Sequence, residues 1–197
     1  MAISYPLSLP TAPGFRELTF RAVNITGMTS SEFTGQQQIT QWQGEYWEAD
    51  ALVPQMVRAS AEPWLAFITA LRGLTGTFLL GPEKQARTAL GSPSGVTVNG
   101  AGQSGTAITL AGTGSFAAGD WIQFGTGATS RLHKVLVASA VAATVEIFPR
   151  LRESPTNGSS VVVSSPKGVF RLADNTREWN IDVARHYGIR FSAMEAF

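Results

Sequence analysis

A glycine-rich run is the first candidate for chemistry in this chain. Residues 100–105 read GAGQSG and match the G-x-G-x-x-G pattern of dinucleotide-binding loops. That chemistry requires the loop to open a helix, whose N-terminus then receives the pyrophosphate of the dinucleotide. The residues that follow, 106–110, read TAITL and favour a strand. We therefore predict a hairpin loop here and no dinucleotide site.

A second run, residues 164–167, spells the Ser-x-x-Lys of penicillin-recognising enzymes. That motif works at the start of a helix, with the lysine one turn after the serine. Here the run lies between strand-like segments, and the companion motifs Ser-Asp-Asn and Lys-Thr-Gly do not occur. We interpret the match as chance.

The histidines and carboxylates give no stronger site. His133 and His186 lack a histidine at metal-ligand spacing, and we expect both on polar strand faces at the surface. Glu45, Glu48 and Asp50 lie beside two aromatic residues, which suggests sugar binding or glycoside hydrolysis. We favour a solvated strand face instead. The sequence therefore assigns no catalytic residue, no cofactor site and no metal site, and we expect a protein that is not an enzyme.

The elements that would position any site include a C-terminal segment that alternates in polarity. In residues 179–191 the odd positions are apolar except for Arg185, and most even positions are polar. This period of two predicts one long strand with one buried face. A half-buried strand at this end of the chain must pair with strands from far earlier. We therefore expect the two ends of the chain to build one domain together.

The N-terminal part predicts strands and one helix. Residues 15–24 alternate as a strand, and residues 36–42 and 46–53 predict two further strands joined at Gln43 and Gly44. A helix is expected at about residues 60–73, with Ser60 as its N-cap. Its apolar stripe, at positions i, i+3, i+4 and i+7, consists of Trp64, Phe67, Ile68 and Leu71.

The composition changes near residue 88. From there to residue 130 Asp120 is the only charged residue, and ten of the chain's 20 glycines lie between residues 91 and 127. Short strand-like runs separated by turn residues predict a small β-barrel or sandwich. These runs are residues 95–98, 107–110, 120–124, 132–137, 144–148 and 160–163.

The expected fold class is therefore mainly β. Residues 1–88 and 166–197 would form a discontinuous β-sandwich domain with one packed α-helix. Residues 89–165 would form a second, all-β domain inserted into it, as is tolerated where two strand ends lie close together at a surface.

The composition points to a protein covered by partners. Charged residues make up 15% of the chain, whereas about 25% is usual for soluble domains. The 15 basic and 14 acidic residues nearly balance, which argues against specific nucleic-acid binding. There is no cysteine. No apolar run approaches the roughly 20 residues that a membrane-spanning helix needs, so no membrane span is expected.

Eight segments of the chain form packing and turn patterns that together cover most of it. They read GFREL (14–18), SEFTGQQQ (31–38), WQGEYW (42–47), WLAF (64–67), GTFLLGP (76–82), GDWIQF (119–124), IFPRLR (147–152) and GVFRL (168–172). With these segments the chain resembles the small tail proteins of long-tailed, siphovirus-like bacteriophages. The closest type is the distal tail protein, a structural component of the tail tip, or baseplate.

The resemblance implies a role in the virion at the tip of the tail, after assembly in the host cytoplasm. Proteins of this type commonly form a ring of six copies between the tail tube protein and the baseplate hub that carries the receptor-binding parts. The tape measure protein and later the genome pass through the lumen of the ring. The family role needs no active-site residue, so none is carried over.

Candidate contact residues follow from this picture. We expect the predicted 36–53 hairpin and the helix near the contact between copies, with Trp42, Glu48, Asp50 and Arg185 as interface residues. An alternative is a carbohydrate-binding β module that touches the host surface, with Trp121 stacking on a sugar. A cell-wall hydrolase is a third possibility, although no pair of carboxylates is assigned to it.

Overall fold

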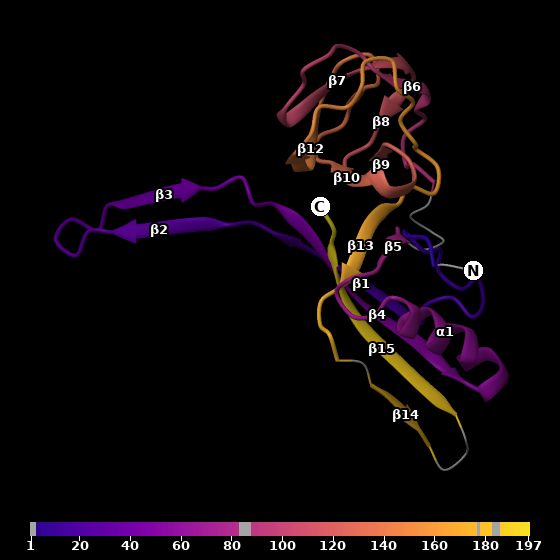
Figure 1. The fold of residues 1–197 in the computed structure, drawn as a ribbon. Coiled ribbons are helices and arrows are strands. Elements are labelled where there is room, and N and C mark those ends of the chain that lie inside the picture. Colours follow the sequence, from indigo (N-terminus) through magenta and orange to yellow (C-terminus); the bar gives the residue numbers. More distant parts are fainter. Residues whose placement is uncertain (1–2, 83–87, 177, 183–185) are drawn as a thin grey trace.

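The computed structural model describes residues 3–82, 88–176, 178–182 and 186–197 (Figure 1). In these ranges the protein is mainly β, with one α-helix and several sheets, which confirms the predicted fold class. The largest sheet has six strands, and its main path runs in the order β1–β4–β15–β13–β5. The strands on this path are β1 (Glu17–Val23), β4 (Tyr46–Met56), β15 (Tyr187–Glu195), β13 (Gly168–Leu172) and β5 (Thr77–Leu80).

The centre of this sheet joins the two ends of the chain. β4 pairs antiparallel with β15, with Ala49 opposite Ala193 and Ala51 opposite Phe191. β13 then connects β15 to β5, which again comes from the N-terminal part. The N-terminal part could not form this sheet alone, because β15 and β13 from the C-terminal part lie between β4 and β5.

The predicted long strand over residues 179–191 is wrong. The structure has a hairpin there: β14 (Trp179–Ile181) pairs antiparallel with the start of β15, with Trp179 opposite Ile189. The turn begins at Asp182, whose backbone N–H donates to the carbonyl of His186 at 3.0 Å. Arg185, a predicted interface residue, lies outside the described residues.

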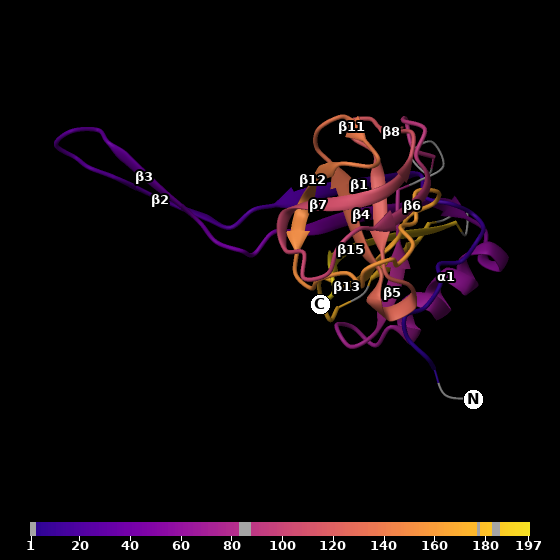
Figure 2. The same ribbon diagram turned by 90° about the horizontal axis from the view of Figure 1, so that it is seen from above.

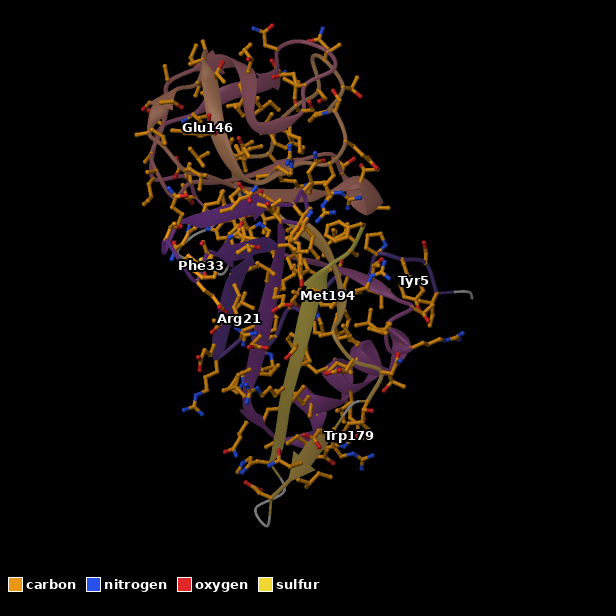
Figure 3. All side chains as sticks on the ribbon, turned by 90° about the vertical axis from the view of Figure 1, so that its left-hand side faces the viewer. Tyr5, Arg21, Phe33, Glu146, Trp179 and Met194 are labelled. Atoms are coloured by element: carbon orange, nitrogen blue, oxygen red, sulfur yellow. The ribbon has the colours of Figure 1, made fainter. Side chains whose placement is uncertain are left out.

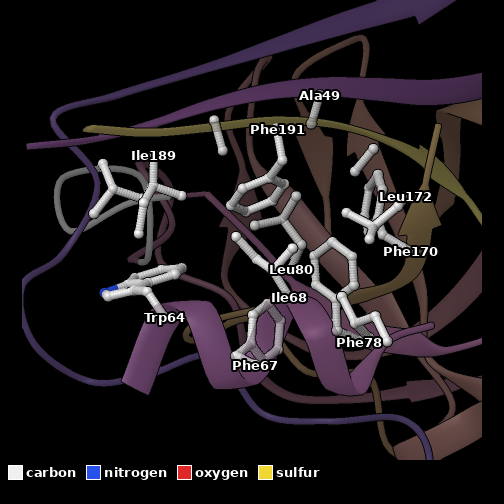
Figure 4. Close-up of a cluster of buried hydrophobic side chains, with 14 of the residues drawn as sticks. Ala49, Trp64, Phe67, Ile68, Phe78, Leu80, Phe170, Leu172, Ile189 and Phe191 are labelled. Carbon is white, nitrogen blue, oxygen red and sulfur yellow. The ribbon is translucent and has the colours of Figure 1, made fainter. Parts of the chain in front are cut away.

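The helix α1 (Arg58–Ala70) covers one face of the sheet (Figure 4). All four residues of its predicted apolar stripe are buried, which confirms the stripe. The aromatic rings form a chain of contacts from the helix to the sheet: Phe67 to Phe78 at 5.5 Å, and Phe78 to Phe191 at 6.0 Å between centroids. Burying side chains of this size contributes about 1.5–3 kcal/mol each, so this cluster fixes the helix on the sheet.

The start of the helix differs from the prediction. Val57 is the N-cap residue, in an extended conformation with no side-chain capping bond, and Ser60 already lies inside the first turn. The helix begins as soon as β4 ends, and Arg58 pairs with Glu62 at 2.9 Å on its exposed face. The chain reversal after β4 therefore sets the start of the helix, and a capping side chain does not.

Residues 24–44 form a two-stranded arm that leaves the body of the protein (Figures 1 and 2). β2 (Thr26–Ser30) pairs antiparallel with β3 (Gln37–Gln41). The prediction that residues 36–42 and 46–53 form a hairpin is therefore wrong: β4 pairs instead with β1 and β15. The arm continues the β1–β4 ribbon outward.

A five-stranded sheet and a second hydrophobic cluster occupy the middle of the chain. The sheet order is β6 (Ser94–Val98), β7 (Gly105–Thr113), β12 (Thr144–Leu151), β10 (Arg131–Val135) and β9 (Trp121–Phe124). The short strands β8 (Ser115–Phe116) and β11 (Ser139–Ala140) pair beside it. The buried residues of this second cluster all lie between Val96 and Val161. We call residues 89–165 the inserted module, with boundaries that stay a prediction.

The two ends of the inserted module lie side by side. Thr88 and Ser164 form an antiparallel bridge, so the chain enters and leaves the module at one point.

The glycine-rich run at 100–105 forms the loop between β6 and β7. There the Gln103 amide donates to the carbonyls of Asn99 and Thr109, at 3.1 Å each. The structure thus confirms the predicted hairpin loop.

Candidate assembly interface

The arm is the most exposed apolar element among the described residues. Met28 and Ile39 stand opposite each other and are 64% and 66% exposed, and Phe33 at the tip is 98% exposed. Glu32 is its only charged residue. An isolated two-stranded hairpin is at best marginally stable in water, because its side chains have no second layer to pack against. Exposed apolar side chains and the lack of a second layer are therefore features that the arm shares with elements that pack against another molecule.

Trp42 lies at the base of the arm and is 54% exposed. Its ring lies so close to Gly27 that a Cβ there would come within 2.9 Å of it. Its backbone N–H donates to the carbonyl of Ile25 at 2.9 Å. The predicted interface residue therefore belongs to the arm, held against the opposite strand with part of its ring in solvent.

The two edges of the large sheet differ. The N-terminal segment covers β5, since Leu7 donates to the carbonyl of Thr77 at 2.8 Å and accepts from Leu79 at 2.9 Å. Among the described residues, no strand pairs with the outer edge of β1. Unpaired edges of this kind can accept a strand from another chain. The open edge of β1 runs directly into the arm, so the two form one continuous unpartnered surface.

Glu48 and Asp50 lie on the face of the sheet opposite α1, and both contact polar side chains of the same chain. Asp50 forms an ion pair with Arg21 and accepts a hydrogen bond from the Ser192 hydroxyl at 2.6 Å. Glu48 lies 3.7 Å from the same arginine. Such exposed pairs contribute about 0–1 kcal/mol. The structure thus brings these two predicted interface residues together, away from Trp42.

Trp121 lies where the inserted module meets the large sheet. Its ring centroid is 4.9 Å from that of Trp47 and 5.3 Å from that of Phe20, and the Lys134 ammonium lies 4.9 Å from it. Trp47 also donates its indole N–H to the carbonyl of Leu132 at 3.1 Å. Packing therefore accounts for Trp121 without a sugar ligand.

A cluster of buried charged groups adjoins this aromatic contact. Glu195 is buried and accepts a hydrogen bond from the backbone N–H of Trp47 at 3.1 Å. Burial raises the pKa of Glu195 to about 7, although that hydrogen bond and the charges of Arg152 and Arg131 act to lower it. A carboxyl group that is partly protonated near neutral pH therefore lies between the two parts of the protein.

Glu45 ties the inner end of the arm to the inserted module. Its carboxylate accepts from the backbone N–H of Arg150 at 3.0 Å, and its carbonyl accepts from the Arg152 guanidinium at 2.6 Å. The carboxylate also accepts from Gln41 on β3 at 2.8 Å. These bonds hold the start of β4 and the end of the arm against β12.

His133 does not lie at the surface as predicted. It is buried, and its Nδ1 lies 2.7 Å from the carbonyl of Pro149, to which it donates as the neutral tautomer. Burial lowers the pKa of His133 to about 4. The strand alternation failed here because β10 is covered on both faces. His186 is half-buried, with Nδ1 3.5 Å from the Asp182 carboxylate.

The sequence interpretation missed the arm as an exposed element. Its signal is present in the sequence: residues 24–44 hold one charge, five glutamines and isolated large apolar residues without a repeating buried face. Such a segment has no continuous apolar face to bury against its own sheet, and it has too few charges for a typical solvated loop.

Comparison of the chain with models of known protein families finds no match, and no curated protein matches it either. Within the described residues, no three histidine or acidic side chains are grouped so that they could hold a metal ion. In the same part of the chain, no helix has the length and apolar character needed to cross a membrane.

Proposed function

We propose that this protein is a structural component of the tail tip of a long-tailed bacteriophage. Copies of it would form a ring between the tail tube protein and the baseplate hub, with six copies as the number that the resemblance implies. The tape measure protein would pass through the lumen. The single observation that supports this proposal most is the arm, a hairpin with one charged residue and exposed apolar side chains, against which no other described segment packs.

A ring requires a head-to-tail contact in which one surface of each copy meets a different surface of the next. The arm and the open edge of β1 supply one such surface. Contacts of this obligate kind bury on the order of 2,000 Å² or more. A low charge density favours such burial, since few ionised groups need to be desolvated.

The test is the mass of the protein in solution, measured by size-exclusion chromatography with light scattering. We expect a ring, formed alone or on addition of purified tail tube and hub proteins. Phe33→Ser should reduce assembly strongly and leave the melting temperature unchanged, because Phe33 is almost fully exposed. Leu90→Ser is the matched control at an exposed leucine of the inserted module. A monomer that persists with all partners present would refute the proposal.

A further inference from the structure

A groove opens in the large sheet where β13 ends and β14 begins. β13 pairs with β15 up to Leu172, opposite Ala193, and β14 resumes pairing at Trp179, opposite Ile189. Between these points residues 174–176 and 178 lie outside the strands, in the segment between β13 and β14 in Figure 1. The groove has a volume of about 1090 Å³ and is floored by β15. It lies at the end of the sheet remote from the inserted module, near Trp179 in Figure 3.

One wall of the groove is fixed in place. Asn175 in the loop accepts a hydrogen bond from the backbone N–H of Leu74, just after α1, at 3.1 Å. Gly73 has a φ of +68°, and a Cβ there would meet the Asn175 side chain at 2.6 Å. The loop is therefore seated against the end of the helix, so this wall exists before any ligand binds.

The groove carries hydrogen-bonding side chains that have no polar partner among the described residues. The side chains of Arg16, Gln55, Asp174, Asn180 and Arg190 line it, and none of them forms a hydrogen bond or ion pair with another described residue. With Glu178, the lining holds two arginines and two carboxylates, so its formal charges cancel. Such a lining favours an uncharged ligand rich in donors and acceptors over a phosphate or a polyanion.

Trp179 adds an aromatic surface at the rim. It lies on β14, which pairs only with β15 among the described strands, and it is 46% exposed. An exposed indole beside amide, carboxylate and guanidinium groups can cover the apolar face of a pyranose ring while the polar groups bind its hydroxyls. We propose that this groove binds an uncharged oligosaccharide of several sugar units. This site is separate from Trp121 and does not depend on ring formation.

The experiment measures binding to the full chain by calorimetry and tryptophan fluorescence. The probes are maltohexaose, cellohexaose and chitohexaose, together with an array of bacterial surface glycans. Trp179→Ala should weaken binding about tenfold or more, by analogy with the loss of stacking on an aromatic side chain. Trp42→Ala is the matched control, because Trp42 has similar exposure and lies on the arm.

A second variant tests the groove at a residue outside β14, the strand that carries Trp179. Asp174→Ala changes only an exposed loop side chain, and we expect it to weaken binding about fivefold through loss of hydrogen bonds to hydroxyls. Circular dichroism checks that each variant is folded. Binding unaffected in both groove variants would overturn the proposal, as would the absence of binding to every probe at millimolar concentration. Phe33→Ser should retain binding, so failure of assembly and failure of this site are distinguishable.

Discussion

Replacing Glu195 with glutamine should change how stability depends on pH. The pKa of this buried carboxyl rises from 4.5 to about 7 in the folded protein. Between these two values the unfolded chain has released a proton that the native protein still holds. The free energy of unfolding contributed by Glu195 is therefore fully present below pH 4.5 and is lost as the pH rises through 7. The full change corresponds to about 3 kcal/mol at 1.36 kcal/mol per pH unit.

His133 acts in the opposite direction, so the wild-type profile alone cannot reveal this effect. Its pKa falls from 6.5 to about 4 in the folded protein. Its contribution is present above pH 6.5 and is lost as the pH falls through 4. Between pH 4.5 and 6.5 the two contributions nearly cancel. The contribution of His133 cancels when the free energies of unfolding of wild type and Glu195→Gln are subtracted, because both proteins contain this histidine.

The assay is urea unfolding at pH values from 4.5 to 8, with the free energy extrapolated to water. Glutamine keeps an acceptor for the N–H of Trp47 and does not ionise, so relative to wild type the variant should gain about 3 kcal/mol as the pH rises. Glu146→Gln, at an exposed position of β12 (Figure 3), is the control and should show no such gain. A difference curve for Glu195→Gln that is flat with pH would refute the reasoning.

Three further predictions concern stability, each measured by urea unfolding. Asp120→Ala should cost about 3 kcal/mol, because the buried carboxylate accepts from the backbone N–H groups of Leu90, Gly91 and Ala117; Asp120→Asn should cost less, and equal costs would contradict this. Trp47→Phe should lower the free energy of unfolding by about 2 kcal/mol, because packing contacts are lost and the carbonyl of Leu132 loses its donor. An unchanged free energy of unfolding would contradict this prediction. Gly114→Ala should cost about 2 kcal/mol or more, since its φ is +87° and the new Cβ would lie 1.9 Å from the Ser92 carbonyl oxygen; Gly158→Ala, with a φ of +76° and open space around it, separates strain from collision.

The C-terminal hairpin shows why periodicity predicted an element but not its topology. The turn between Ile181 and Tyr187 has an odd number of residues, so paired positions such as Trp179 and Ile189 are both odd. The alternation therefore continues through the turn as if the strand were unbroken. The buried face was predictable from the pattern, whereas the reversal depended on the local bonds between Asp182 and His186.

Side-chain surroundings set the other limit of prediction. The helix stripe, β1, β5 and most strands of the inserted module followed from spacing, because one face of each must be buried. Trp121 and His133 did not, since their partners come from distant segments: Trp121 meets Phe20 and Trp47, and His133 meets the carbonyl of Pro149. No period within a strand reports what covers its second face.

The bridge between Thr88 and Ser164 makes the middle of the chain look easy to exchange, since a short connector could close the gap. However, Leu132 of this module is buried in the hydrophobic cluster of the large sheet, which includes Trp47 and Phe170. Excising residues 89–165 would take away the carbonyl that receives the Trp47 indole N–H and would open this cluster to water. A successful transplant of a foreign module would therefore have to bring its own apolar plug for that opening.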